Sequence, residues 1–267
     1  MGHVVAAPAA AWRALGGSVT GSVHRRQGRG CDDAFGWHVD DAVVVAVTAD
    51  GAGSRPGTSA LGAFTAVQAV LGAAERHDVL DMERLFHNAL AAVDDAADEL
   101  GVAPDLLATT LTVAVIAGAR VVVGQVGDGI AVHGAGETVE AVAVGERPEH
   151  VNETVFLTTP GALADHLRTF STRADTVDAL ALTTDGLRYQ VLDDVPANRP
   201  FAPFFQAAWQ YARRADATPD AITAFLDELE DQSGDDKTLV LAVRDPSGTA
   251  HATTCASGRP QVWVPAG

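Results

Sequence analysis

Aspartates at the borders of apolar segments are the residues of this sequence best placed to do chemistry. Two apolar runs end in the same Asp-Gly dipeptide, at Asp50 and at Asp185. Asp33 lies shortly before the first of these runs, and Asp235 lies before another apolar run near the C-terminus. Asp128, after a fourth apolar run, is a fifth candidate. If the ends of these runs converge, several carboxylates meet in one cleft.

Such a cleft needs a counter-charge, because like charges at close quarters destabilise a fold and raise one another's pKa. Hard divalent cations supply that charge, and ligation by oxygen alone suits Mg²⁺ or Mn²⁺ better than zinc. A glycine such as Gly51, directly after the aspartate, lets a backbone carbonyl approach a metal closely. One Asp-Gly is usually only a turn, and residues 127–129 alone are typical of a hairpin. The recurrence of aspartates at several strand borders favours a metal site.

The apolar runs predict buried strands, because they are rich in Val, Thr and Leu. The predicted strands cover residues 42–48, 109–116, 121–126, 151–157, 179–184 and 238–243. Periodicity and caps predict helices over residues 58–74 and 82–100 and from Thr218 to Leu229. Residues 103–157 hold no good helix and predict an antiparallel meander. Strand groups and helix pairs thus segregate, which favours antiparallel sheets covered by helices over a doubly wound parallel sheet.

Composition limits the partners and the compartment. The 267 residues include 18 basic and 35 acidic side chains, a formal net charge of −17 that disfavours nucleic acid and anionic membranes. No apolar stretch reaches the length of a membrane span, and the N-terminus does not resemble a secretion signal. Cys31 and Cys255 make neither a disulfide framework nor a four-ligand zinc site. The sequence therefore predicts a cytoplasmic protein.

Seven segments resemble, in order, the motifs of the bacterial branch of the type 2C, metal-dependent Ser/Thr protein phosphatases. The matching segments are residues 31–34, 47–53, 108–111, 126–129, 152–154, 182–187 and 235–239. No single segment is specific, but their ordered set is. The resemblance implies an α+β fold, a four-layer α-β-β-α sandwich of two antiparallel β-sheets flanked by helix pairs. It also implies an N-terminal extension over residues 1–15, a phosphatase domain over 16–246 and a C-terminal strand or tail over 247–267.

The resemblance further implies a site for two Mn²⁺ or Mg²⁺ ions. Asp50 would bridge both ions, the Gly51 carbonyl and Asp33 would complete one shell, and Asp185 with Asp235 would hold the other. A third, weaker ion would bind Asp128 together with Asp185. A water bridging the two ions would attack phosphorus in line, without a covalent enzyme intermediate. The implied substrates are phosphoserine and phosphothreonine on proteins, and the implied partners are a Ser/Thr kinase or its targets.

Two departures from the family pattern concern catalysis. Many relatives place His directly after Asp-Gly to protonate the leaving alcohol, whereas this chain has Ala52. Relatives from animals have a phosphate-binding Arg shortly before the first metal-binding Asp. Here the candidates for that role are Arg25, Arg26 and Arg29, with His24 close by, and we favour Arg29 or His24. The catalytic residues predicted from the sequence are therefore Asp50, Asp185, Arg29 and His24.

The sequence also bears on three alternatives to a metal-dependent phosphatase. A nucleotide-binding loop at residues 51–59 lacks the required Lys and glycine spacing. A cysteine-dependent phosphatase would need Arg six residues after its nucleophile, but Trp37 follows Cys31 at that distance. The third alternative is a catalytically silent phosphatase-like domain that binds a phosphoprotein or a regulator. The missing His at position 52 keeps this alternative open, although all five candidate aspartates are present.

Overall fold

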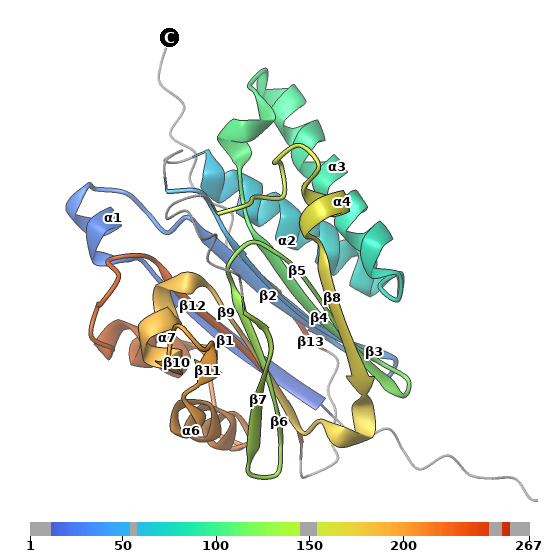
Figure 1. The fold of residues 1–267 in the computed structure, drawn as a ribbon, viewed down its shortest axis with the longest axis vertical. Helices are drawn as coiled ribbons and strands as arrows, with labels where there is room; N and C mark the ends of the chain where they lie inside the picture. Colours follow the sequence, from blue (N-terminus) through green and yellow to red (C-terminus); the bar gives the residue numbers. More distant parts are fainter. Residues whose placement is uncertain (1–11, 54–57, 145–153, 246–252, 257–267) are drawn as a thin grey trace, which may run out of the picture.

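The computed structural model describes residues 12–53, 58–144, 154–245 and 253–256, which fold into two facing antiparallel sheets with helices outside them (Figure 1). The six-stranded sheet has the order β13-β2-β3-β4-β5-β8. Its strands are β13 (Thr253–Ala256), β2 (Asp33–Val39), β3 (Val43–Asp50), β4 (Leu111–Ala117), β5 (Arg120–Val126) and β8 (Arg168–Arg173). The five-stranded sheet has the order β1-β12-β9-β6-β7. Its strands are β1 (Trp12–Val19), β12 (Lys237–Arg244), β9 (Ala179–Thr183), β6 (Ile130–Ala135) and β7 (Thr138–Val144).

Each sheet is covered on its outer face by a pair of helices. Helices α2 (Ser59–Glu75) and α3 (Met82–Leu100) pack on the six-stranded sheet. Helices α6 (Ala202–Ala212) and α7 (Pro219–Glu228) pack on the five-stranded sheet. The predicted α+β, four-layer sandwich is thereby confirmed. The remaining short elements are α1 (Ser22–Arg26), α4 (Ala162–His166), α5 (Arg188–Val191) and a ribbon of β10 (Leu192–Asp194) with β11 (Arg199–Pro200).

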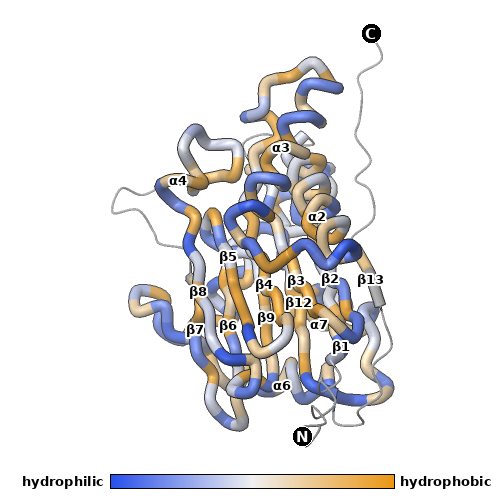
Figure 2. Tube along the Cα trace, turned by 90° about the vertical axis from the view of Figure 1, so that its right-hand side faces the viewer, coloured by the Kyte–Doolittle hydropathy of each residue, from blue (hydrophilic) through white to orange (hydrophobic). Residues whose placement is uncertain are grey.

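Strand β3 shows why the central strands are apolar on both faces. Val43, Val45 and Val47 pack in the core beneath α2 and α3. Val44 and Ala46, which alternate with them, pack in the core between the two sheets. Because a strand turns successive side chains to opposite faces, a strand in an inner layer needs a continuous apolar run. Figure 2 shows this as hydrophobic colour along the central strands.

At two of the three predicted helices the observed caps agree with the predicted ends, whereas Thr58 at the start of α2 makes no side-chain cap hydrogen bond. Helix α3 begins after Asp81, whose side chain accepts a hydrogen bond from the Arg84 amide, and it ends at Gly101 in the left-handed conformation. Helix α7 begins after Thr218, whose hydroxyl accepts a hydrogen bond from the Ala221 amide. These caps satisfy backbone groups that have no partner inside the helix. No helix in the described ranges has the length and apolar character needed to cross a bilayer.

The predicted meander over residues 103–157 is wrong at its centre. Strands β4 and β5 form a hairpin in one sheet, but β6 and β7 form a hairpin in the other. Residues 127–129 therefore cross between the sheets and do not close a hairpin. The crossing is held by Gln125, whose buried amide donates to the Gly129 carbonyl at 2.7 Å. Gly127 has a φ of 105°, and a Cβ there would lie 2.5 Å from the Thr110 side chain.

The predicted strand over residues 151–157 is not formed in its described part, and residues 151–153 lie outside the described residues. Leu157 is buried, and its amide donates to the Thr109 carbonyl, so the apolar segment serves as an anchor. At the chain ends, β1 begins at Trp12, inside the predicted extension. Strand β13 pairs with β2 at an edge of its sheet, within the predicted tail. The division of the chain at residues 15 and 246 stays a prediction.

Candidate metal centre

The five predicted aspartates converge at one end of the two sheets. Asp33 opens β2 and lies directly opposite Asp50, the last residue of β3. Asp185 begins the 3₁₀ turn after β9, and Asp128 lies in the crossing between the sheets. One carboxylate oxygen from each of Asp50, Asp128 and Asp185 lies within 4.8 Å of the others. Asp235, just before β12, is near enough to raise the pKa of Asp50. These five residues are called the acidic cluster below.

Threonine hydroxyls orient Asp33 from the neighbouring strands. Its carboxylate is buried, and Oδ2 accepts hydrogen bonds from Thr184 Oγ1 at 2.8 Å and from Thr238 Oγ1 at 2.6 Å. Its other oxygen, Oδ1, is buried without a hydrogen-bond partner, and so is Oδ1 of Asp185. A buried carboxylate oxygen without a donor is costly unless a cation contacts it. The partnerless oxygens therefore fit a bound cation.

The cluster holds more negative charge than its surroundings neutralise. Burial, followed by the charge of Asp33 and then that of Asp185, raises the pKa of Asp50 well above its usual range. Burial and the charge of Asp236 likewise raise the pKa of Asp33 well above its usual range. Burial, and then the charges of Asp128 and Asp235, raise the pKa of Asp185 to about 7. Without a cation the fold thus opposes ionisation of these groups.

Two neighbouring threonines fix the backbone of Asp50. The Asp50 amide donates to Thr110 Oγ1 at 3.0 Å, and the Asp50 carbonyl accepts from Thr109 Oγ1 at 3.1 Å and from the Thr110 amide at 2.8 Å. Thr154 in turn donates to Asp128 Oδ2 at 2.9 Å. Asn152 and Glu153 of the same segment lie outside the described residues. Thr109, Thr110 and Thr154 therefore orient the acidic cluster from its edge.

The glycines after Asp50 and Asp185 permit close backbone packing. A Cβ on Gly51 would lie 2.7 Å from the Asp32 carbonyl oxygen, and one on Gly186 would lie 1.9 Å from the Asp236 carbonyl oxygen. Any larger residue would push apart the loops that hold the acidic cluster. The repeated Asp-Gly dipeptide thus has a packing reason in this fold, in addition to the predicted approach of the Gly51 carbonyl to a metal.

Asp236 is a structural residue of the site that the sequence analysis did not select. It is buried, and its carboxylate accepts hydrogen bonds from the Gly21 amide at 2.7 Å and from the Asp32 amide at 2.6 Å. Nδ1 of His24 lies 3.0 Å from Asp236 Oδ2. Asp236 therefore ties together the start of α1, the start of β2 and the loop that contains Asp235. The consecutive aspartates in the sequence were the available signal, but they do not tell which of the two is buried.

The two basic candidates from the sequence lie in different surroundings. Arg29 forms an ion pair with Asp32, and its Nη1 donates to the Gly53 carbonyl at 3.2 Å. His24 is buried, with Nε2 lying 4.0 Å from Asp235 Oδ1 and 3.8 Å from where a Cβ on Gly53 would be. The imidazole of His24 therefore stands beside the loop in which relatives have His at the position of Ala52.

Arg188 is a second site residue that sequence reasoning missed. It is only 5% exposed, and its Nη2 donates to the Asp128 carbonyl at 2.8 Å. Its charge lowers the pKa of Asp185, against the larger effects that raise it. Nη1 is buried and has no hydrogen-bond partner. A buried guanidinium thus borders the acidic cluster, and nothing in the sequence around residue 188 distinguishes it from a surface arginine.

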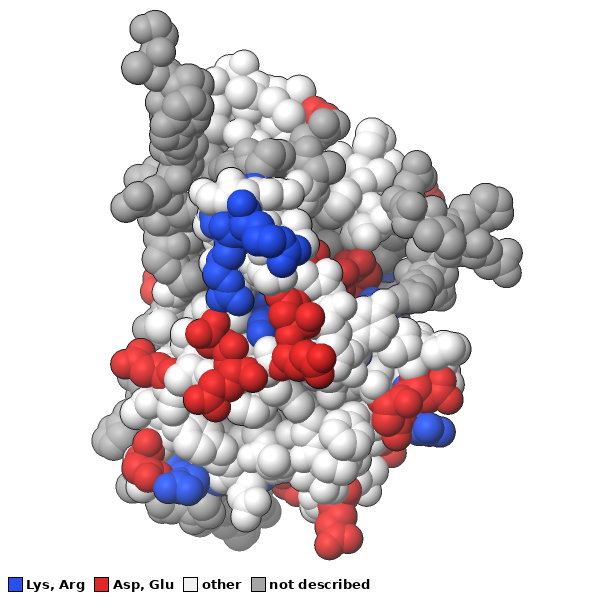
Figure 3. All heavy atoms as spheres, turned by 90° about the vertical axis from the view of Figure 1, so that its left-hand side faces the viewer, with Lys and Arg blue, Asp and Glu red and all other residues white. Residues whose placement is uncertain are grey.

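Basic side chains also gather on the surface over α1, next to acidic side chains (Figure 3). Arg25 and Arg26, in the last turn of α1, are exposed, and Arg25 pairs with Asp227 at 2.9 Å. Despite the strongly negative total charge, this part of the surface can attract an anionic group toward the neighbouring acidic cluster.

The sequence profile of the protein phosphatase 2C family matches residues 20–227. The chain belongs to the protein phosphatase 2C family. Among solved structures, serine/threonine phosphatase Stp1 from Staphylococcus aureus shares 17% identity and a TM-score of 0.60, over 91% of this chain and 98% of Stp1. Mycobacterium tuberculosis PstP/Ppp, also a serine/threonine phosphatase, shares 15% identity and a TM-score of 0.55, over 88% of this chain and 99% of that one.

A structure of the catalytic domain of PstP contains two manganese ions. This catalytic domain shares 18% identity and a TM-score of 0.54 with the present chain, over 87% of the present chain and 98% of the PstP chain. Curated protein sequences give no match. The profile match identifies the family, and the structural matches agree with the predicted fold.

Proposed function

We propose that this chain hydrolyses phosphoserine and phosphothreonine on proteins in a reaction that depends on two Mn²⁺ or Mg²⁺ ions. The observation that best supports the proposal is the convergence of five aspartates with buried, partnerless oxygens on Asp33 and Asp185. A set of oxygen ligands of this kind suits hard divalent cations. The silent-domain alternative would be expected to have lost such carboxylates, and this chain retains them.

The predicted ligands can be assigned to the ions as follows. Asp50 would contact both ions, Asp33 and the Gly51 carbonyl would complete one shell, and Asp185 with Asp235 would complete the other. Asp128, held by Thr154 and by the neighbouring Arg188, would join Asp185 at a third and weaker position. When bound, the ions supply a water that is activated near neutral pH and neutralise charge on the phosphoryl group.

The chain's own residues would orient the substrate and supply the proton. We propose His24 as the proton donor to the leaving alcohol, because its Nε2 stands beside Asp235 and the loop of Ala52. The paired Arg29, with the exposed Arg25 and Arg26, would guide a phosphorylated segment of a protein to the acidic cluster. Asp50 and Asp185 remain the central catalytic residues of the proposal.

The proposed partners are a Ser/Thr kinase or the targets of such a kinase, since these supply phosphorylated proteins. We also propose that the protein acts in the cytoplasm, where its two cysteines, both free, would remain reduced.

The decisive experiment is hydrolysis of a phosphothreonine peptide with Mn²⁺, with Mg²⁺ and with EDTA. Wild-type protein should turn over only with metal, and Asp50→Asn should lower kcat/KM on the order of a thousandfold, since several kcal/mol of charge stabilisation are lost. Asp98→Asn, an exposed carboxylate on α3, serves as the matched control and should behave like wild type. Absence of turnover by folded wild-type protein with either metal would contradict the proposal and favour the silent binding domain.

A further inference from the structure

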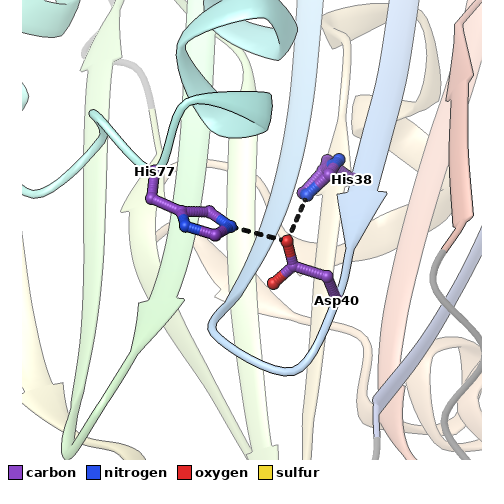
Figure 4. Close-up of side chains that lie close together, drawn as sticks. All are labelled: His38, Asp40 and His77. Carbon is purple, nitrogen blue, oxygen red and sulfur yellow. Dashed lines mark hydrogen bonds and ion pairs between the residues drawn. The ribbon is translucent and has the colours of Figure 1, made fainter.

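A second cluster of metal-ligand side chains lies at the opposite end of the β2–β3 hairpin (Figure 4). His38 comes from β2, Asp40 from the turn between β2 and β3, and His77 from the segment after α2. Nε2 of His38 lies 2.9 Å from Asp40 Oδ2, and Nε2 of His77 lies 2.8 Å from the same oxygen. These three residues are called the His-Asp-His cluster below.

The backbone fixes the position of the Asp40 carboxylate. Its Oδ1 accepts hydrogen bonds from the Ala42 and Val43 amides, both at 2.8 Å, which closes the turn between the strands. Oδ2 is thereby turned toward the two imidazoles. A carboxylate with one oxygen held by the backbone and the other shared by two imidazole nitrogens is positioned as an ordered metal ligand.

His77 adopts a backbone conformation that glycine and asparagine adopt more readily. Its φ is 54°, in the left-handed region, where a non-glycine residue is uncommon. Glycine or asparagine would fit this position after a helix with less strain. The conformation brings the ring of His77 onto Asp40, from a segment far from Asp40 in the sequence. Backbone strain at a residue with a ligand side chain is a common feature of functional sites.

We propose that His38, Asp40 and His77 form a binding site for Zn²⁺ or a similar first-row transition-metal ion. Two imidazole nitrogens and one carboxylate oxygen are a common three-ligand set for Zn²⁺, with water as the fourth ligand. The His77 side chain is 53% exposed, so solvent reaches the site, whereas His38 lies mostly buried beneath it. Each imidazole would bind through Nε2, with its proton on Nδ1.

The two clusters should differ in the metals they select. Imidazole ligands favour Zn²⁺, Co²⁺ and Ni²⁺, whereas a cluster of carboxylates favours Mg²⁺ and Mn²⁺. The seven residues of β2 separate the two clusters by roughly 20 Å, at about 3.3 Å per residue. The proposed Zn²⁺ site is therefore independent of the proposed phosphatase activity and can be tested in protein that is unable to catalyse.

The test uses the full, tag-free chain with Asp50→Asn and Asp185→Asn, so that the acidic cluster is weakened. After treatment with EDTA, this protein is titrated with Zn²⁺ by calorimetry and with Co²⁺ by visible absorption. The same measurements are then made on this protein with the further substitution His77→Asn. Asn tolerates a positive φ, so this substitution removes only the imidazole. The added change His87→Asn is the matched control, since His87 is an exposed histidine on α3 that lies 4.0 Å from Glu83.

We expect one equivalent of Zn²⁺ to bind, together with a Co²⁺ absorption band typical of tetrahedral ligation. His77→Asn should weaken binding at least about tenfold, since even changes beyond the ligands cost 10- to 100-fold in affinity. His87→Asn should leave both signals unchanged. Absence of Zn²⁺ binding, or binding that His77→Asn leaves unchanged, would overturn the proposal and identify the cluster as a hydrogen-bonded link between the turn and α2.

Discussion

The two ends of the β2–β3 hairpin place aspartates in opposite electrostatic surroundings. At the acidic cluster, Asp33 and Asp50 face each other among further carboxylates, and their pKa values are raised. At the His-Asp-His cluster, burial would raise the pKa of Asp40, but hydrogen bonds from His38, His77 and backbone amides outweigh it and lower that pKa. When no metal is bound, the same strands therefore hold aspartates whose charge is opposed at one end and an aspartate whose charge is stabilised by hydrogen bonds at the other.

The two ends differ both in burial and in the number of donors: Asp40 is less deeply buried than Asp33, and more donors surround its carboxylate. Each donor stabilises the charged form. Asp40 has four donors, two from imidazoles and two from amides. Asp185 has like charges nearby and a buried oxygen without a donor. Removing Mn²⁺ or Mg²⁺ should therefore destabilise the end with the acidic cluster and leave the end with the His-Asp-His cluster almost unchanged.

The pH dependence of stability in EDTA is the largest expected effect. Asp185 has a pKa of about 7 in the fold, against an ordinary value of 3.8, so the folded state binds more protons between these limits. Stability must then fall as pH rises from about 4 to 7, on the order of a few kcal/mol. Thermal melts over this range should show the fall in EDTA and lose most of it with saturating Mn²⁺. A stability that rises over this range in EDTA would contradict the assignment.

Arg188→Gln tests the buried cation beside the acidic cluster. Removing one charge from a buried group of opposite charges costs about 3–5 kcal/mol. We expect a loss of about 3 kcal/mol in EDTA and less than half of it with Mn²⁺, because bound cations replace the missing charge. Urea unfolding with and without metal measures both values. Arg120→Gln, in an exposed residue of β5, is the control, and equal losses in both conditions would show that Arg188 acts through packing alone.

His24→Gln separates proton donation from other roles at the acidic end. Loss of a general acid costs about a hundredfold or more when the leaving group is a poor one such as an alcohol. We therefore expect a drop of about a hundredfold in kcat on a phosphothreonine peptide and little change on p-nitrophenyl phosphate, whose leaving group needs no proton. His38→Gln, at the other end, should change neither rate. An equal drop on both substrates would assign His24 a structural role through Asp236.

The smallest expected effect is on the free energy of unfolding, which Asp50→Asn and Asp40→Asn should change in opposite directions. In EDTA at neutral pH, Asp50→Asn should stabilise the fold, because it removes a charge that its neighbours disfavour. Asp40→Asn should destabilise it by about 1–2 kcal/mol, because hydrogen bonds to a charged group are weakened. Urea unfolding of the two variants measures both changes. Destabilisation by both would show that Asp50 is paired in the metal-free protein.

Local patterns in the sequence were sufficient to predict the strands β3, β4, β5, β9 and β12 and the helices α2, α3 and α7, but not β1, β2, β6 or β7. The Val-rich runs became β3, β5 and β12, and the predicted cap at Thr218 agrees with the start of α7. The aspartates were predicted because each borders a strand, which is a property of neighbouring residues. Helix α6 and strand β8 were not singled out, since neither has an apolar run or cap as distinct as those of α3.

The sequence by itself determined which residue types stand at the strand ends, because chain order fixes the border of each apolar run. Only the tertiary structure decided that residues 127–129 cross between sheets and bring Asp128 to Asp50 and Asp185. It also decided that Arg188 is buried and that His77 reaches Asp40. These contacts join residues far apart in the chain, and their energy depends on the surrounding solvent and charge, which no local pattern specifies.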